Sequence, residues 1–257
     1  MASSSFPSAP KSAPFLLPPF SHFSVTKGVW TFSRPFARFG LVPIGGRSTA
    51  IKLNDGGLWV LASTPLNEPT KAKLDELGPV KYIVSADAVH YLFLSEFKKA
   101  YPDAKLYAPK AAIERCNDKT LKFDGVWGGS DSDGKTFDFE NEIQHCYFSG
   151  FKNRDVAFFH ADSKVMVEAD LLFNLPATEQ YSKSTSSGYV PSWGQINPWN
   201  WMHPKLVWQL GENKEEMKRD AKTVAGWNFE KIIPCHGDVI ENDGNKAWRE
   251  AYKAFLD

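Results

Sequence analysis

The chain has 257 residues, of which 42% are hydrophobic and 23% charged, and its 30 basic and 30 acidic side chains leave no net charge. This length can form one large domain with a substantial core, and the composition is typical of a folded protein. Zero net charge argues against a nucleic-acid partner, and no apolar run reaches the ~18 residues of a membrane span, so we expect no membrane partner. Cys116, Cys146 and Cys235 are too widely spaced for a disulfide framework and indicate reduced thiols in the cytoplasm. The oligomeric state stays open.

The N-terminal 25 residues differ in composition from the rest of the chain. Five prolines and a run of three serines block helix formation and remove backbone donors. We therefore expect residues 1–25 to form an extended or flexible arm and residues 26–257 to fold as a single domain. An organelle transit peptide is the alternative, because Asp55 is the first acidic residue, although Lys11 alone is basic before Lys27.

Short strands dominate the first half of the folded region. They are predicted at 29–32, 49–53, 58–62, 80–84 and 106–108. The second and third flank Asn54-Asp55-Gly56-Gly57, where glycine allows the positive φ of a tight hairpin turn. One helix is predicted from Pro69 to Gly78, and another carries Phe93, Phe97 and Tyr101 on one face.

The second half follows a loop at 128–134 that is rich in Gly, Asp and Ser. Strands are predicted at 143–148, 156–159, 165–167 and 229–233, and helices at 214–225 and 247–255. Each half therefore runs strands, helix, strand. This order predicts an α/β (α+β) protein in which two mixed β-sheets stack face to face with helices on the outer faces.

Acidic and imidazole side chains follow three of the predicted strands. Asp87 and His90 come after 80–84, Asp170 after 165–167, and His236 after 229–233. The carboxyl ends of strands are where α/β folds bind ligands. Two imidazoles and two carboxylates suit one divalent metal ion, either Zn or else Fe or Mn. If the four groups lie apart, the protein holds no metal.

The order of several motifs along the chain resembles the metallo-β-lactamase superfamily, in a divergent branch known as a domain of unknown function. The motifs span roughly residues 26 to 257 and are Trp30...Pro35-Phe36, Gly45-Gly46-Arg47-Ser48-Thr49, Leu53-x-Asp55-Gly56-x-Leu58-Trp59-Val60, His90-Tyr91-Leu92-Phe93-Leu94, the segment 163–173 and Ile233-Pro234-Cys235-His236-Gly237-Asp238. The resemblance implies a metallo-β-lactamase-like αββα sandwich.

The chain departs from this superfamily at the metal ligands. Active members carry His-x-His-x-Asp-His, whereas this chain reads Ser85-Ala86-Asp87-Ala88-Val89-His90. The next histidine of the superfamily falls near Phe151, which cannot ligate. Asp170 and His236 match the bridging aspartate and the terminal histidine. The resemblance thus implies one metal at most, bound by Asp87, His90, Asp170 and His236.

Two classes of function follow from these residues. The leading hypothesis is a hydrolase that acts on a small organic ester, lactone or amide, in which Asp87, His90, Asp170 and His236 also form the catalytic group. The alternative is a metal-free protein of the same fold that binds a small molecule or a partner. A non-hydrolytic isomerase or dehydratase that uses a His/Asp pair is a further possibility.

An aromatic segment at 190–203 stands apart in composition. Trp193, Trp199, Trp201 and His203 are candidates for a wall or lid that binds the substrate, and the alternative is a loop that seals the core with its own aromatics. His203 precedes Pro204 and could simply begin a helix. Arg47 is a candidate either for anion binding or for a turn.

Overall fold

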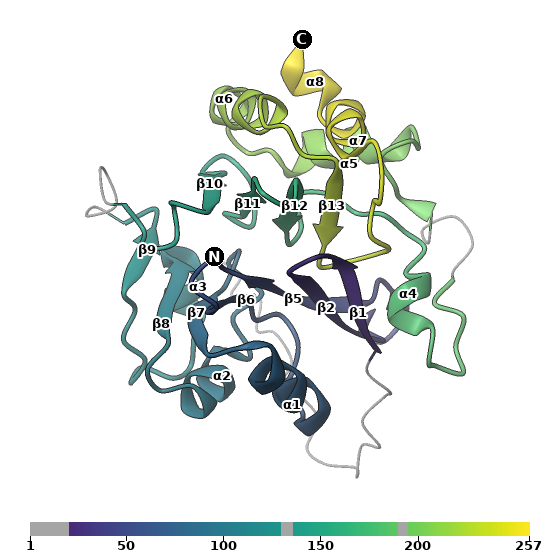
Figure 1. Ribbon diagram of the computed structural model, residues 1–257. Coiled ribbons are helices and arrows are strands. Elements are labelled where there is room, and N and C mark those ends of the chain that lie inside the picture. Colours follow the sequence, from purple (N-terminus) through teal and green to yellow (C-terminus); the bar gives the residue numbers. More distant parts are fainter. Residues whose placement is uncertain (1–20, 130–135, 190–194) are drawn as a thin grey trace, which may run out of the picture.

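Two mixed sheets form the centre of the computed structural model, which describes residues 21–129, 136–189 and 195–257 (Figure 1). The first sheet has seven strands, in the order β1 (Ser21–Thr26), β2 (Val29–Arg34), β5 (Gly46–Lys52), β6 (Leu58–Leu61), β7 (Val80–Val84), β8 (Lys105–Pro109) and β9 (Gly125–Trp127). The second has four, in the order β10 (Ile143–Tyr147), β11 (Val156–His160), β12 (Val165–Glu168) and β13 (Lys231–Pro234). A small ribbon of β3 (Ala37–Arg38) and β4 (Val42–Pro43) projects from the first sheet.

Each sheet changes strand direction once. Neighbours from β1 to β6 are antiparallel, and those from β6 to β9 are parallel. Neighbours from β10 to β12 are antiparallel, whereas β12 and β13 are parallel. The parallel pairs arise where a helix connects one strand to the next. Strand ends that precede helices or long loops therefore gather at common edges, as the sequence pattern predicts.

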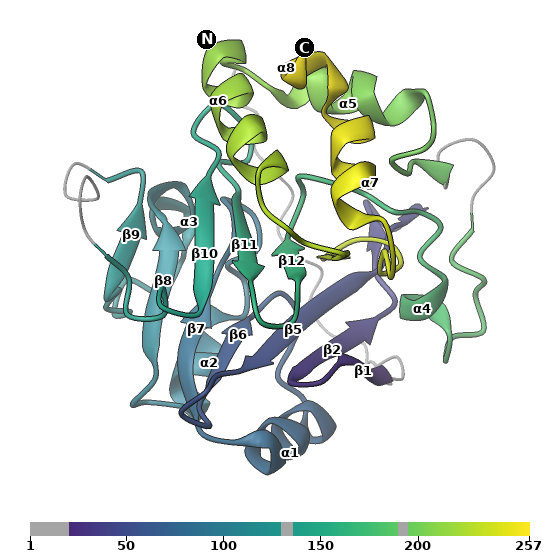
Figure 2. The ribbon, with the colours of Figure 1, turned by 45° about the horizontal axis from the view of Figure 1, so that its top comes forward.

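Helices cover the outer face of both sheets (Figures 1 and 2). On the seven-stranded sheet they are α1 (Glu68–Leu77), α2 (Leu94–Ala100) and α3 (Lys110–Arg115). On the four-stranded sheet they are α5 (Met202–Leu210), α6 (Lys214–Ala225), α7 (Gly244–Ala251) and α8 (Lys253–Leu256). The short helix α4 (Thr178–Tyr181) lies beside β2. This arrangement confirms the predicted αββα sandwich.

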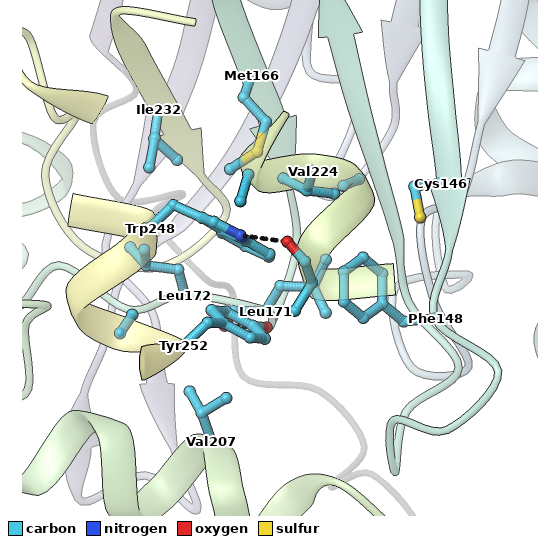
Figure 3. Close-up of a cluster of buried hydrophobic side chains, with 14 of the residues drawn as sticks. Cys146, Phe148, Met166, Leu171, Leu172, Val207, Val224, Ile232, Trp248 and Tyr252 are labelled. Carbon is cyan, nitrogen blue, oxygen red and sulfur yellow. Dashed lines mark hydrogen bonds between the residues drawn. The ribbon is translucent and has the colours of Figure 1, made fainter. Parts of the chain in front are cut away.

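Aromatic side chains fill the space between the layers. Between the sheets, the Trp59 ring meets Phe158 edge-on at a centroid distance of 4.9 Å. Under the helices of the four-stranded sheet, Trp248 and Tyr252 stack at 3.8 Å, and the Trp248 indole donates a hydrogen bond to the carbonyl of Ala221 (Figure 3). The Tyr252 hydroxyl donates to the carbonyl of Leu171 at 2.8 Å. This bond ties the C-terminal helices to the segment that carries Asp170.

The structure corrects the predicted N-terminal boundary. Residues 21–25 were assigned to a flexible arm, yet they lie in β1 and pair with β2 in antiparallel register. The last prolines of the arm are Pro18 and Pro19, so the backbone donors of the following residues are free to join the sheet edge. Residues 1–20 lie outside the described part of the chain.

The cysteines and the helices bear on two further expectations from the sequence. The three cysteines are free and buried, in agreement with the predicted absence of a disulfide framework. Within the described ranges, no helix has both the length and the apolar character needed to cross a membrane.

Candidate metal centre

Three strand ends from both sheets converge on one point. His90 follows β7 of the larger sheet, whereas Asp170 and His236 follow β12 and β13 of the smaller one. The parallel register pairs Glu168 with Pro234, so Asp170 and His236 each lie two residues beyond the last pair. One ligand atom from each of His90, Asp170 and His236 lies within 4.8 Å of the others. The structure therefore brings together three of the four residues predicted to bind metal.

The hydrogen bonds of the two imidazoles determine which ring nitrogens face this point. The Nδ1 atom of His90 lies 2.8 Å from Oδ1 of Asp87, and Nδ1 of His236 lies 2.7 Å from the carbonyl oxygen of Gly45. An ionised carboxylate and a carbonyl oxygen only accept hydrogen bonds, so both Nδ1 atoms carry hydrogen. In neutral rings, the lone pairs are therefore on the two Nε2 atoms, which face each other at 3.2 Å.

The third donor is a carboxylate oxygen without a hydrogen bond. Oδ1 of Asp170 is buried, accepts no hydrogen bond from the described residues and lies 3.3 Å from Nε2 of His236. Its other oxygen accepts a hydrogen bond from the side-chain amide of Asn153. A buried carboxylate oxygen without a donor is costly unless a cation is close. Oδ1 of Asp170 is therefore poised to bind a cation.

The two rings differ in pKa, and this difference determines which of them holds the shared proton. Burial lowers the pKa of His90, but the charge and hydrogen bond of Asp87 outweigh it and raise this pKa to about 9. Burial and the neighbouring His90 lower the pKa of His236 to about 3. His90 is thus the protonated ring of the pair and donates from Nε2 to His236. A metal ion that binds both Nε2 atoms must displace this proton.

The residues present fit one divalent ion. Two imidazole nitrogens and one carboxylate oxygen form a two-histidine, one-carboxylate set, which suits Zn, Fe or Mn. Each ligand is also held by a hydrogen bond on its other side: His90 donates to Asp87, His236 donates to the Gly45 carbonyl, and Asp170 accepts from Asn153, as is usual for metal ligands. In residues 21–129, 136–189 and 195–257, no other group of three His, Cys, Asp or Glu side chains converges in this way.

Asp87 has a different role from the one that its position in the sequence suggested. It is fully buried, and Oδ1 accepts hydrogen bonds from the backbone of Val89 and His90 as well as from the His90 ring. Nδ1 and Nε2 lie at opposite corners of an imidazole, so a carboxylate on Nδ1 cannot reach an ion on Nε2. Asp87 is therefore not part of the convergent ligand set, against the prediction of a fourth ligand; it closes the turn after β7 and orients His90.

Asn153 was not found from the sequence. The superfamily pattern pointed to Phe151, but that ring is fully buried in the core. Two residues later, Asn153 reaches Asp170 with its side chain and accepts a hydrogen bond from Ala88 through its carbonyl, at 2.8 Å. Counting residues could not locate it, because the loop turns through Arg154 at φ +55° and so shifts the register. The one sign of it in the sequence was that a polar residue, Asn153, follows two positions after Phe151.

Two glycines and one arginine shape the loop that carries His236. Gly237 has φ +93°, and a Cβ there would lie 2.2 Å from the carbonyl oxygen of Asn174. Gly45 has φ +71°, and a Cβ there would lie 2.0 Å from Oε1 of Gln180. Only glycine tolerates both constraints. The backbone can therefore come close enough for Gly45 to accept from His236.

Arg47 fixes the backbone of the loop that carries His236. It is fully buried in β5 and donates to the carbonyls of Pro234 at 2.7 Å and of Gly237 at 2.6 Å. Its guanidinium also pairs with Glu179 at 2.6 Å. Neither alternative from the sequence describes it, because Arg47 lies in a strand and already has a carboxylate partner.

His203 contacts the metal-site residue His236 only indirectly, through Phe173. The Phe173 ring stacks on His236 with an interplanar angle of 6° and a centroid distance of 5.8 Å. The backbone N–H of Phe173 donates to Nε2 of His203 at 3.0 Å. His203 is fully buried, and burial lowers its pKa to about 4, so its ring is neutral. It lies at the start of α5 and does not line the cavity over the metal centre.

A cavity of about 360 Å³ opens over the three ligands. Its lining residues come from β2, β5, the β3–β4 ribbon and its flanks, and the segments that follow β6, β7, β12 and β13. They are Arg34, Phe36, Arg38, Ile44, Gly46, Arg47, Ser63, Thr64, Val89, His90, Leu92, Phe93, Asp170, Cys235 and His236.

The aromatic segment does not form the described wall of this cavity. Trp199 and Trp201 are 53% and 68% exposed and are absent from the lining. Trp193 lies outside the described residues. The described apolar walls are instead made by Phe36, Ile44 and residues of the 88–93 loop.

Comparison with known proteins agrees with this architecture. The family model described as "Domain of unknown function (DUF4336)" matches residues 26–185. No curated protein matches the sequence. The structure is similar to that of a metallo-beta-lactamase from Pontibacter korlensis, with 12% identity, a TM-score of 0.58 and coverage of 93% of this chain and 100% of the other.

Two further solved structures extend the likeness. The metallo-beta-lactamase FIM-1 from Pseudomonas aeruginosa, in its mono-zinc form, gives 14% identity, a TM-score of 0.56 and coverage of 95% and 100%. A mutant flavo di-iron protein from Thermotoga maritima gives 13% identity, a TM-score of 0.62 and coverage of 93% of this chain and 63% of that one. At such identities the likeness shows the fold alone. The chain therefore has the metallo-β-lactamase fold, and it belongs to the DUF4336 family.

Proposed function

We propose that the protein is a metal-dependent hydrolase that acts on a small organic ester, lactone or amide, with one divalent ion held by His90, Asp170 and His236. One observation carries the proposal. The Nε2 atoms of two histidines and a buried carboxylate oxygen that accepts no hydrogen bond from the described residues meet at the floor of a cavity of metabolite size. The mono-zinc and di-iron proteins of similar fold support the choice of a transition metal.

The protein side of the mechanism is preorganisation. Asp87 and the Gly45 carbonyl hold the two rings in the tautomer that presents Nε2, and Asn153 holds Asp170. When bound, the ion supplies Lewis acidity toward a carbonyl oxygen and toward water. None of the three ligands needs to reorganise during the reaction, because their orienting bonds are already made.

The cavity walls position the rest of the substrate. Phe36, Ile44, Leu92 and Phe93 present apolar surface around the ligands. An apolar wall excludes water from the reacting carbonyl and orients the body of an organic molecule.

Elemental analysis tests this proposal directly. Purified protein is expected to hold about one equivalent of Zn, Fe or Mn, and His90→Ala and His236→Ala are expected to lose it together with hydrolysis of a panel of aryl esters and lactones. His145→Gln is the matched control, since His145 pairs with Glu140 away from the centre, and it is expected to retain both. Metal-free protein whose melting temperature ignores chelator would overturn the proposal and favour the metal-free binding protein.

A further inference from the structure

The cavity over the metal centre has an unusual charge balance. Apart from the two histidines, the charged residues among the described lining are the cationic Arg34, Arg38 and Arg47 and one acid, Asp170. Arg47 is neutralised by Glu179, and Asp170 is a ligand for the ion. Arg34 and Arg38 place further positive charge around a cavity whose floor is the proposed cation site.

Arg38 is the more informative of the two. Its side chain lines the same cavity as His90, Asp170 and His236. Arg38 is exposed, and among the described residues it makes no ion pair, although it lies over the Phe39 ring at 5.4 Å. A guanidinium that lines a cavity can attract a small anion into it and bind it through charge-assisted hydrogen bonds.

A buried hydroxyl group points to the same ligand chemistry. Ser48 Oγ accepts hydrogen bonds from the backbone of Ser63 and Thr64, at 2.9 and 2.8 Å, which occupies both of its lone pairs. Its own proton must therefore go to Thr64 Oγ1, 2.7 Å away. The Thr64 proton is left to donate elsewhere, and Thr64 lines the cavity while only 1% exposed.

Arg34, Phe36 and Thr64 lie on one wall, and Arg38 lines the same cavity. A Cβ built on Gly46 would lie 3.7 Å from Cγ of Arg34, 3.6 Å from Cβ of Phe36 and 3.8 Å from Cγ2 of Thr64, so the three side chains surround this glycine. The wall combines guanidinium and hydroxyl donors with the apolar surface of Phe36. No carboxylate other than the ligand Asp170 is among the described residues that face it.

We propose that the wall formed by Arg34, Arg38 and Thr64 is an anion subsite, and that the substrate is a small organic anion. This proposal rests on the proposed function and names its substrate class. The substrate carries a carboxylate or a phosphate monoester, which a guanidinium fork binds through two parallel hydrogen bonds. Its apolar body lies against Phe36 and Leu92, and its scissile carbonyl reaches the metal centre.

Titration calorimetry with three probes of similar shape tests the subsite. Phenylacetate and phenyl phosphate are anionic, whereas phenylacetamide is neutral. Both anions are expected to bind, with the amide weaker by about tenfold or more, and the stronger anion identifies the group that the substrate carries. Each titration is run on metal-loaded and on chelator-treated protein, because a carboxylate could also bind the metal directly.

Charge variants assign the binding to this wall. Arg38→Gln and the double variant Arg34→Gln/Arg38→Gln are expected to weaken anion binding by about tenfold or more in both protein forms, with unchanged metal content. Arg38→Lys keeps the charge but not the fork and should fall between them. Lys222→Gln on α6, exposed and remote, is the matched control for net charge and should bind as the wild type does.

The outcomes separate this proposal from the hydrolase proposal. Equal binding of phenylacetate and phenylacetamide, no anion binding, or equal binding by Arg38→Gln and the control would each overturn the anion subsite, whatever the metal content. Anion binding that depends on Arg38 in protein that never takes up metal would support the subsite and overturn the hydrolase.

Discussion

His90 and His236 are 146 positions apart in the chain, yet their Nε2 atoms face each other at 3.2 Å. Each ring is anchored at its far corner, one by the Asp87 carboxylate and the other by the Gly45 carbonyl. The two anchors hold the rings so that their Nε2 atoms converge. This opposed pair, rather than any local motif, is the basis of the candidate metal centre.

Removing the anchor of His90 should weaken metal binding without removing a ligand. In Asp87→Asn, the side-chain oxygen still accepts from the backbone of Val89 and His90, but the negative charge beside the ring is lost. We expect metal affinity to fall by about 10- to 100-fold, the usual range for such outer-sphere partners. Competition with a chromophoric chelator measures the change. Asp75→Asn, which removes an exposed carboxylate on α1, is the control and should leave affinity unaltered.

Arg47 is expected to be important for stability because it is buried and fully bonded. Arg47→Met leaves Glu179 without its cation and the Pro234 and Gly237 carbonyls without donors. Breaking a buried pair in this way costs about 3–5 kcal/mol of unfolding free energy. Urea denaturation measures the loss. The double variant Arg47→Met/Glu179→Gln should recover part of it, and a double variant no more stable than the single one would argue against the ion pair as the cause.

Because His203 is buried, the free energy of unfolding should depend on pH in a specific way. Burial lowers its folded-state pKa from 6.5 to about 4, so between these values the unfolded chain binds more protons than the folded one. The contribution of the neutral ring is therefore complete above pH 6.5 and is lost as the pH falls toward 4. Its amplitude is at most about 3 kcal/mol.

Denaturation curves at several pH values test this dependence by comparison. His203→Gln keeps an acceptor for the Phe173 N–H but cannot titrate, so the stability of the wild type should fall more steeply than that of the variant below pH 6.5. Taking the difference between the two proteins removes the effect of other groups, such as His236, that titrate in the same range. Parallel curves would contradict the assignment.

The hydroxyl of Tyr252 links the C-terminal helices to the metal-binding segment. Tyr252→Phe keeps the stacking on Trp248 but leaves the Leu171 carbonyl without its buried donor. We expect a loss of about 1–3 kcal/mol in unfolding free energy, measured by thermal or urea denaturation. Tyr82→Phe is the comparison: Tyr82 is only partly buried, and its hydroxyl makes no hydrogen bond to the described residues. Equal losses for both variants would show that the bond to Leu171 is not important.

Much of the secondary structure could be predicted because it depends on local chemistry. The helix at 214–225 agrees residue for residue, since Met217, Ala221 and Val224 recur at helical spacing and all three are buried. The hairpin around Gly56 formed because that residue adopts φ +83°. The start of the sheet at Ser21 was missed because an edge strand is defined by its partner, β2, and not by its own composition.

The sequence by itself identified His90, Asp170 and His236, because each polar group comes just after an apolar strand, and strand ends meet at sheet edges. Only the tertiary structure decided which of the four candidates share a point. Asp87 and His90 come from one turn, but Asp87 contacts Nδ1 of the His90 ring, whereas Asp170 and His236 lie near its Nε2. It also identified Asn153, Gly45 and Arg47 as their supports. These contacts join residues far apart in the chain through distances of about 3 Å, and such distances depend on sheet packing and loop path, which residue spacing does not encode.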